Sequence, residues 1–230
     1  MLVLTRTVIA TLVSGSVVAG QGIAGAPVPR VPPPEEERAL ALEAAPEELR
    51  AGAGVWLLTR AGFVHDRETT NGYTCIVNRD EVLALKPTCF DVEGTATVLP
   101  AIVRFGNLLM EGMPVPQIRK DIENGFKDGR FVSPRRAGIA FMMSPRIVNV
   151  LDAAAGTVGT APPHYMIYAP NVSQSDLRLP MSVYNAHPWL PYAAYTGPHG
   201  FIIVSIPDSS GAMKQHRAMH HTAGQGKARQ

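Results

Sequence analysis

The chain has 230 residues, of which 46% are hydrophobic and only 17% are charged, and its formal net charge at pH 7 is +2. This hydrophobic content can bury a core, which excludes disorder of the whole chain, and the near-neutral charge argues against a nucleic-acid binder that neutralises phosphates. The 21 glycines and 20 prolines exclude a long helical bundle or coiled coil, because so many turn-forming residues require extensive loops.

Residues 1–26 have the order of a secretory signal peptide. Arg6 is their one charge, the apolar run 8–13 follows, and small residues at 24–26 come last. Polar residues interrupt the apolar stretch, so it falls short of the roughly 20 residues that a membrane-spanning helix needs. We therefore expect cleavage after residue 26, export to the periplasm or the cell exterior, and no stable membrane anchor in the cleaved protein.

Residues 27–53 are rich in proline and glutamate. The prolines at 27–34 predict an extended, semi-rigid spacer, because proline fixes φ and has no backbone donor. Residues 35–50 are compatible with a short helix, since Ala, Leu and Glu favour helices and glutamate suits a helix N-terminus. Their few large apolar side chains predict only weak docking.

Residues 54–212 have the length of a single domain and open with strand signals. The apolar runs 55–58 and 63–64 are separated by a turn, and a third run at 73–77 follows the Asn71-Gly72 dipeptide, which favours turns with positive φ. These three runs predict an antiparallel meander.

Two helices and a second group of strands follow. Apolar residues recur at helical spacing in 98–111 and 116–128, whereas 138–143, 165–168 and 201–206 are short apolar runs bounded by glycine or proline. Strands, then helices, then strands predict an α+β fold. We expect an antiparallel sheet of about five or six strands with two helices packed on one face.

The chain has two cysteines, Cys75 and Cys89, fourteen positions apart. In an exported protein they are expected to form one disulfide bond, because such bonds persist in oxidising compartments. The alternative is a cysteine hydrolase with Cys75 as the nucleophile and His164 as its base, oriented by Asn171 or Asp91. That alternative requires Cys75 to be free.

Three stretches, 70–75, 87–94 and 163–170, resemble an uncharacterised group of exported bacterial proteins. The resemblance spans most of residues 54–206. It implies an exported bacterial protein, and it assigns no catalytic residue because the group has no established activity.

Several other residues are candidates for catalysis or metal binding. His164, His187 and His199 each adjoin a proline, and neighbouring strand ends could bring His164 and His199 together as a zinc or copper site or as catalytic groups. Asp91 and Glu93 could act as general acid and base or bind a hard cation. The plainer interpretation is that the histidines hydrogen-bond backbone groups and that the carboxylates lie solvated in a loop.

Two C-terminal segments suggest binding. Residues 180–198 form an aromatic, proline-rich loop that could contact a carbohydrate or a protein, although its aromatic side chains could equally fill the core. Residues 213–230 predict a flexible basic tail. Thioether and imidazole groups of the tail suit copper, unless its histidines are incidental; the candidate ligands are Met213, His216, Met219, His220 and His221.

The phosphate-binding, dinucleotide-binding and nucleophile-elbow motifs do not occur in the sequence. We therefore expect an exported, non-enzymatic binding or interaction domain that does not bind nucleic acid. The alternatives are a hydrolase or metal-dependent enzyme that uses His164 and His199, and metal binding by the tail.

Overall fold

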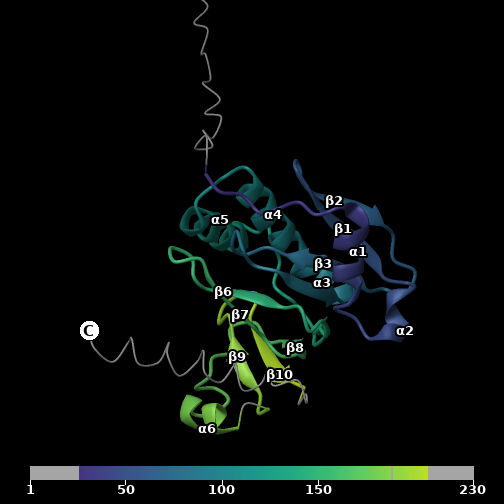
Figure 1. Ribbon diagram of the computed structural model, residues 1–230. Coiled ribbons are helices and arrows are strands. Elements are labelled where there is room, and N and C mark those ends of the chain that lie inside the picture. Colours follow the sequence, from purple (N-terminus) through teal and green to yellow (C-terminus); the bar gives the residue numbers. More distant parts are fainter. Residues whose placement is uncertain (1–25, 188, 207–230) are drawn as a thin grey trace, which may run out of the picture.

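The computed structural model describes residues 26–187 and 189–206 (Figure 1). Its main feature is an eight-stranded sheet in the order β2-β1-β3-β4-β5-β8-β10-β9, and β6 pairs separately with β7. The ten strands are β1 (Gly54–Thr59), β2 (Gly62–Arg67), β3 (Thr74–Asn78), β4 (Lys86–Phe90), β5 (Ile139–Met142), β6 (Val148–Asp152), β7 (Thr157–Thr160), β8 (His164–Tyr168), β9 (Tyr192–Ala194) and β10 (Phe201–Ser205).

The described part of the chain contains six helices: α1 (Pro34–Leu42), α2 (Glu47–Arg50), α3 (Val92–Thr97), α4 (Leu99–Met110), α5 (Val115–Lys127) and α6 (Met181–Ala186). The α+β class is confirmed, and α4 and α5 occupy the two helical segments expected from apolar periodicity. Most of the expected signal peptide and the whole expected tail, 213–230, lie outside the described residues.

The sheet is larger than the five or six strands expected from the sequence. β4 was missed because Pro87 interrupts its apolar pattern, and β9 because it has only three residues. The antiparallel meander is also wrong, since β3 lies parallel to β1, with Gly54 opposite Thr74. A hydrogen bond of 2.8 Å from the Gly54 amide to the Tyr73 carbonyl begins that pairing.

Helices cover both faces of the sheet rather than one, because successive strand residues point to opposite sides. Leu58, Ile76 and Phe90 belong to a core shared with the start of α4. The intervening Cys75 and Cys89 belong to a second core, formed with α1 and the segment that follows it. The first of these faces carries the pocket described below.

The expectation that residues 35–50 dock weakly is wrong. Ala41 and Ala44 have no exposed surface, and they let the end of α1 approach the sheet closely. Glu37 of α1 is also fully buried, and its carboxylate accepts two hydrogen bonds, of 2.8 and 3.2 Å, from Arg79. Small side chains and an internal ion pair therefore dock α1 without large apolar residues.

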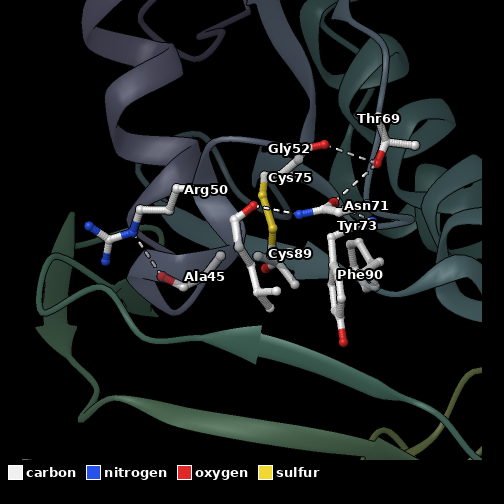
Figure 2. Close-up of a disulfide and its surroundings, with 12 residues drawn as sticks. Ala45, Arg50, Gly52, Thr69, Asn71, Tyr73, Cys75, Cys89 and Phe90 are labelled. Carbon is white, nitrogen blue, oxygen red and sulfur yellow. Dashed lines mark hydrogen bonds between the residues drawn. A yellow bond between two sulfur atoms is a disulfide. The ribbon is translucent and has the colours of Figure 1, made fainter.

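The expected disulfide is present between Cys75 and Cys89, which lie directly opposite each other in β3 and β4 (Figure 2). Two hydrogen bonds in the surrounding segments order the chain beside it: Asn71 Nδ2 donates to the Leu49 carbonyl over 2.7 Å, and Arg50 Nε donates to the Ala45 carbonyl over 2.9 Å. Because Cys75 is oxidised and buried, it is not a free nucleophile, and the cysteine hydrolase interpretation is withdrawn.

Among the helices of the described residues, none is long and apolar enough to cross a membrane.

Candidate binding pocket

A pocket of about 130 Å³ lies between the sheet and helices α4 and α5. Its walls are mainly apolar and come from five strands, β3, β4, β5, β8 and β10, and from helices α4 and α5. The apolar lining residues include Phe90, Ile102, Phe105, Met142, Met166 and Phe201. A cavity of roughly 150 Å³ lined by aliphatic and aromatic side chains is known to accept benzene. The pocket is slightly smaller than that cavity and therefore has about the size of one six-membered ring.

The position of α4 is fixed by contacts with the β1–β2 hairpin. Gly106 of α4 lies directly against the Phe63 ring, where a Cβ would overlap the ring carbons. The next residue, Asn107, accepts a hydrogen bond of 2.7 Å from the Phe63 amide through its Oδ1. These contacts hold the helix close to the hairpin, and its face bearing Ile102 and Phe105 lines the pocket.

The polar side of the pocket has two cations, Lys86 and Arg119, and each pairs with a carboxylate. Lys86, at the start of β4, donates a hydrogen bond of 2.5 Å to Asp80 Oδ2. Arg119 of α5 bonds Glu81 over 3.3 Å, and its guanidinium carbon lies 5.8 Å from the centre of the Phe105 ring. Asp80 lines the pocket together with Lys86, whereas Glu81, the partner of Arg119, does not line it.

Two of the residues that line this pocket each have one unmatched polar atom. Asp80 Oδ1 and His199 Nδ1 are buried and have no hydrogen-bond partner within the described part of the structure. The His199 ring stacks on Phe126, with 5.2 Å between ring centres. Burial lowers the pKa of His199, which keeps its imidazole neutral at pH 7. A buried unpaired polar atom is destabilising, and because both atoms are sealed from solvent, neither is open to a ligand in the pocket as the structure stands.

Tyr195 and Lys86 line both this pocket and a second one of about 410 Å³. The Tyr195 backbone has φ of 55°, a left-handed conformation that is uncommon for a bulky residue. Burial alone would lower the pKa of Lys86, but the neighbouring Tyr195 and Asp80 raise it overall, so the ammonium stays charged. Tyr195 therefore adopts an unfavourable backbone conformation at the boundary between two pockets.

The structure does not bring the three candidate histidines together. His164 is the first residue of β8 and lies opposite Ser205, the last residue of β10. His199 comes just before the start of β10. The two histidines therefore lie at opposite ends of the antiparallel pair of β8 and β10. His164 lines the second pocket, and its Nδ1 is 2.8 Å from the Pro162 carbonyl. His187 is exposed and packs edge-on against Trp189.

No group of three or more His, Cys, Asp or Glu side chains that could hold a metal ion occurs in residues 26–187 and 189–206. The candidate copper ligands of the tail, Met213, His216, Met219, His220 and His221, lie outside the described residues. The described residues therefore add no metal site to the pocket.

Asp91 occupies a structural position at the start of α3. Its Oδ1 accepts hydrogen bonds of 2.9 Å from the Gly94 amide and from the Tyr168 hydroxyl, and its Oδ2 accepts one of 2.8 Å from the Ile139 amide. It is the N-cap of the helix, and it links α3 to β5 and β8. All of these contacts serve the fold, and Asp91 does not line either pocket.

Glu93 lies near Asp91 in sequence and also has structural contacts. Its carboxylate accepts hydrogen bonds from the Arg135 amide (2.8 Å) and from Arg136 Nε (2.9 Å). The Arg135 amide and then the Arg136 side chain hold the pKa of Glu93 below its usual value, against the opposing effect of burial. The ionised Glu93 side chain therefore holds the segment at 135–136 against α3.

The aromatic segment 180–198 is not a continuous loop, since it contains α6 and β9. Tyr184 is buried and packs on Tyr192, with 4.6 Å between ring centres. Trp189 and Tyr195 are half-exposed. Both interpretations of the aromatic residues thus apply, because some fill the core and others face solvent.

Sequence analysis identified His199 but missed Asp80, Lys86 and Arg119. The signal for Lys86 is its place directly before the run 87–90, which is buried in the sheet. Asp80 and Arg119 carried no comparable signal, because many surface loops and helices contain such charges. No family model, curated protein or solved structure matches this chain.

Proposed function

We propose that this protein binds a small, mainly apolar molecule in the 130 Å³ pocket without changing it chemically. The observation that carries the proposal is the pocket itself, which has a mainly apolar wall and a polar side formed by Asp80, Lys86 and Arg119. An apolar pocket with a few converging polar groups is the usual form of a ligand site.

The contacts of the catalytic candidates support a binding role over hydrolysis. Cys75 is in a disulfide, and the oxygens of Asp91 accept hydrogen bonds that hold α3. His164 and His199 lie at opposite ends of the β8–β10 pair, which does not favour their acting on one substrate. We also propose export, supported by the disulfide and by the signal-like order of residues 1–26.

The binding role is tested by nuclear magnetic resonance, with amide shifts recorded while cyclohexanol is added to millimolar concentration. Shifts confined to α4, β4 and the segment at 195–199 are expected, with a dissociation constant in the millimolar range, which corresponds to about −4 kcal/mol. Ile102→Phe fills part of the pocket and should weaken this binding at least tenfold.

Ile167→Phe is the matched control, because it makes the same change on the other face of β8, where the side chain is 37% exposed. It should leave binding unchanged. Absence of shifts at the pocket, or equal weakening by both variants, would contradict the proposed binding site.

A further inference from the structure

A row of side chains crosses five strands of the sheet and passes from a covered part to an open part. Its members, each directly opposite the next, are Cys75, Cys89, Phe141, Tyr165 and Val204. Opposite residues point to the same face, so the whole row lies on the face that carries α1. The two cysteines have no exposed surface, whereas Phe141, Tyr165 and Val204 are only half-buried. The cover formed by α1 therefore ends near β5.

Two positions along each strand, a second row on this face shows the same opening. It consists of Ile139, Ile167, Ile202 and Ala193, and Ile167 is 37% exposed. On the opposite face of the same strands, Ala140, Met166 and Ile203 are at most 6% exposed. The described helices make their main contacts with β1 to β4. The residues of these two rows on β5, β8, β10 and β9 thus form an uncharged, mainly apolar surface, here called the open face.

The size of the open face distinguishes between a second copy of the chain and a single segment. Four strands about 4.8 Å apart and about five residues long, at about 3.4 Å per residue, cover roughly 19 by 17 Å, or roughly 320 Å². A standard protein–protein interface buries about 800 Å² on each partner, so a dimer formed through this face alone would be too weak to persist. A helix is about 10 Å wide with its side chains, and one helix, α1, already covers β1, β3 and β4 on this face.

The C-terminal segment, residues 207–230, begins beside the open face and lies outside the described residues. β10 ends at Ser205, and the next amide, that of Ile206, donates a hydrogen bond of 2.9 Å to the Pro163 carbonyl. The chain therefore leaves the sheet between two strands of the open face. The residues at 207–211 are Pro, Asp, Ser, Ser and Gly, which are turn-forming types that allow the chain to reverse its direction.

Residues 212–223 have the pattern of an amphipathic helix. At about 100° per residue, an arc of about 120° contains Ala212, Met213, His216, Met219, His220 and Ala223. Lys214 and Arg217 fall outside this arc, and Ala218 lies on the far side of the helix. At about 1.5 Å per residue this segment is about 18 Å long, which matches the length of the strands. So short a helix is marginal in water, so it requires a surface to pack on.

We propose that residues 212–223 dock on the open face as a helix, with Met213 and Met219 against Ile167 and its neighbours. The basic side chains stay in solvent. Docking through small and flexible side chains has a precedent on the same face, where α1 packs through Ala41 and Ala44. The docked helix lies on the opposite side of the sheet from the 130 Å³ pocket, so it does not depend on the proposed ligand.

Trypsin cleavage of the full chain, followed by mass spectrometry, measures the docking. Trypsin cuts after Lys214, inside the proposed helix, and after Lys227, beyond it. Relative to a synthetic peptide of residues 207–230, cleavage after Lys214 should be about tenfold slower, because the protease acts on the undocked fraction, and cleavage after Lys227 should be unchanged. Met219→Asp places a charge against the open face and should remove this protection. Ala218→Asp, on the far side of the helix, is the matched control and should keep it.

Nuclear magnetic resonance of methyl-labelled protein locates the docked segment. Nuclear Overhauser contacts are expected between the Met219 and Ile167 methyl groups. Met219→Asp should shift the methyl signals of Ile167 and Ile202, and it should leave that of Ile102, on the pocket face, unchanged.

Each outcome decides the inference. Equal cleavage after Lys214 in the chain and in the peptide would overturn it. Protection without contacts to Ile167 would also overturn it, because the segment would then dock elsewhere. Contacts that appear only between differently labelled chains, with a dimer in sedimentation velocity, would assign the open face to a second copy and overturn it as well. Protection that Met219→Asp alone removes, together with contacts to Ile167 within one chain, would support it.

Discussion

Replacing Glu37 with glutamine tests how much the buried ion pair contributes to stability. The Glu37 and Arg79 side chains are 0% and 1% exposed, and Arg79 also donates a hydrogen bond of 3.0 Å to the Val77 carbonyl. Glu37→Gln leaves the guanidinium buried without its counter-charge. Breaking a buried pair in this way costs about 3–5 kcal/mol.

Arg38 and Asp66 provide a matched control one residue along α1. Their side chains also form two hydrogen bonds, of 2.8 and 2.9 Å, but they are 36% and 21% exposed. Asp66→Asn should cost no more than about 1 kcal/mol, because solvent screens exposed pairs. The two variants thus differ mainly in burial, while the kind of ion pair and the helix stay the same.

Urea unfolding followed by circular dichroism measures both variants with the disulfide intact. Glu37→Gln should also lower the melting temperature by roughly 6–20 °C, since 1 kcal/mol corresponds to about 2–4 °C in a chain of this size. A double variant, Glu37→Met with Arg79→Met, should recover most of the loss, because no buried charge is then left unpaired. The reasoning is refuted if Glu37→Gln costs no more than Asp66→Asn.

Three further predictions concern the same fold. Burial lowers the pKa of His164, so the unfolded chain binds a proton at this position more readily than the folded chain, and the stability should fall as the pH drops below about 6.5, the usual histidine pKa. His164→Asn should reduce the loss of stability between pH 8 and pH 5.5, as measured by urea unfolding at both values. Gly94→Ala should cost about 1–3 kcal/mol, since its Cβ would overlap the Tyr168 hydroxyl; an unchanged melting temperature would contradict that contact. Reducing the disulfide between Cys75 and Cys89, which closes a loop of fourteen residues, should cost about 3 kcal/mol, measured by urea unfolding with and without reductant.

The elements that could be predicted from the sequence are those specified by local patterns. The helix at 98–111 was found because its apolar residues repeat at helical spacing, and these residues pack partly on the sheet and partly against α5. The parallel pairing of β1 with β3 could not be found in this way. It depends on the return of residues 68–73 across the end of the hairpin, and strand runs alone do not specify such a long-range contact.

The docking of α1 shows a second limit. Sequence analysis counted large apolar residues, but the helix docks through Ala41, Ala44 and a buried carboxylate. Whether Glu37 is a surface charge or an internal one depends on Arg79, which is 42 positions away. Similarly, His199 was singled out for its place before a strand, but its position in the wall of a pocket depends on helices and strands from distant parts of the chain.

The pocket occurs where the helix layer stops short of the full width of the sheet. α4 packs against β2 and β3, near one edge of the eight strands. Large sheets twist, so a straight helix covers only part of such a face. Over the remaining strands, residues of the segment 195–199 line the 130 Å³ pocket, and β6 lines the 410 Å³ pocket.

This arrangement separates stability from binding. The Glu37–Arg79 pair lies with α1 on the sheet face opposite the pocket, and neither residue lines it. Glu37→Gln should therefore lower stability without changing the affinity of the folded protein for cyclohexanol. Ile102→Phe should instead weaken the binding of cyclohexanol, because its ring fills part of the pocket. If Glu37→Gln also weakened the binding of cyclohexanol to the folded protein, the pocket would be part of the core packing and not a site at the margin of the core.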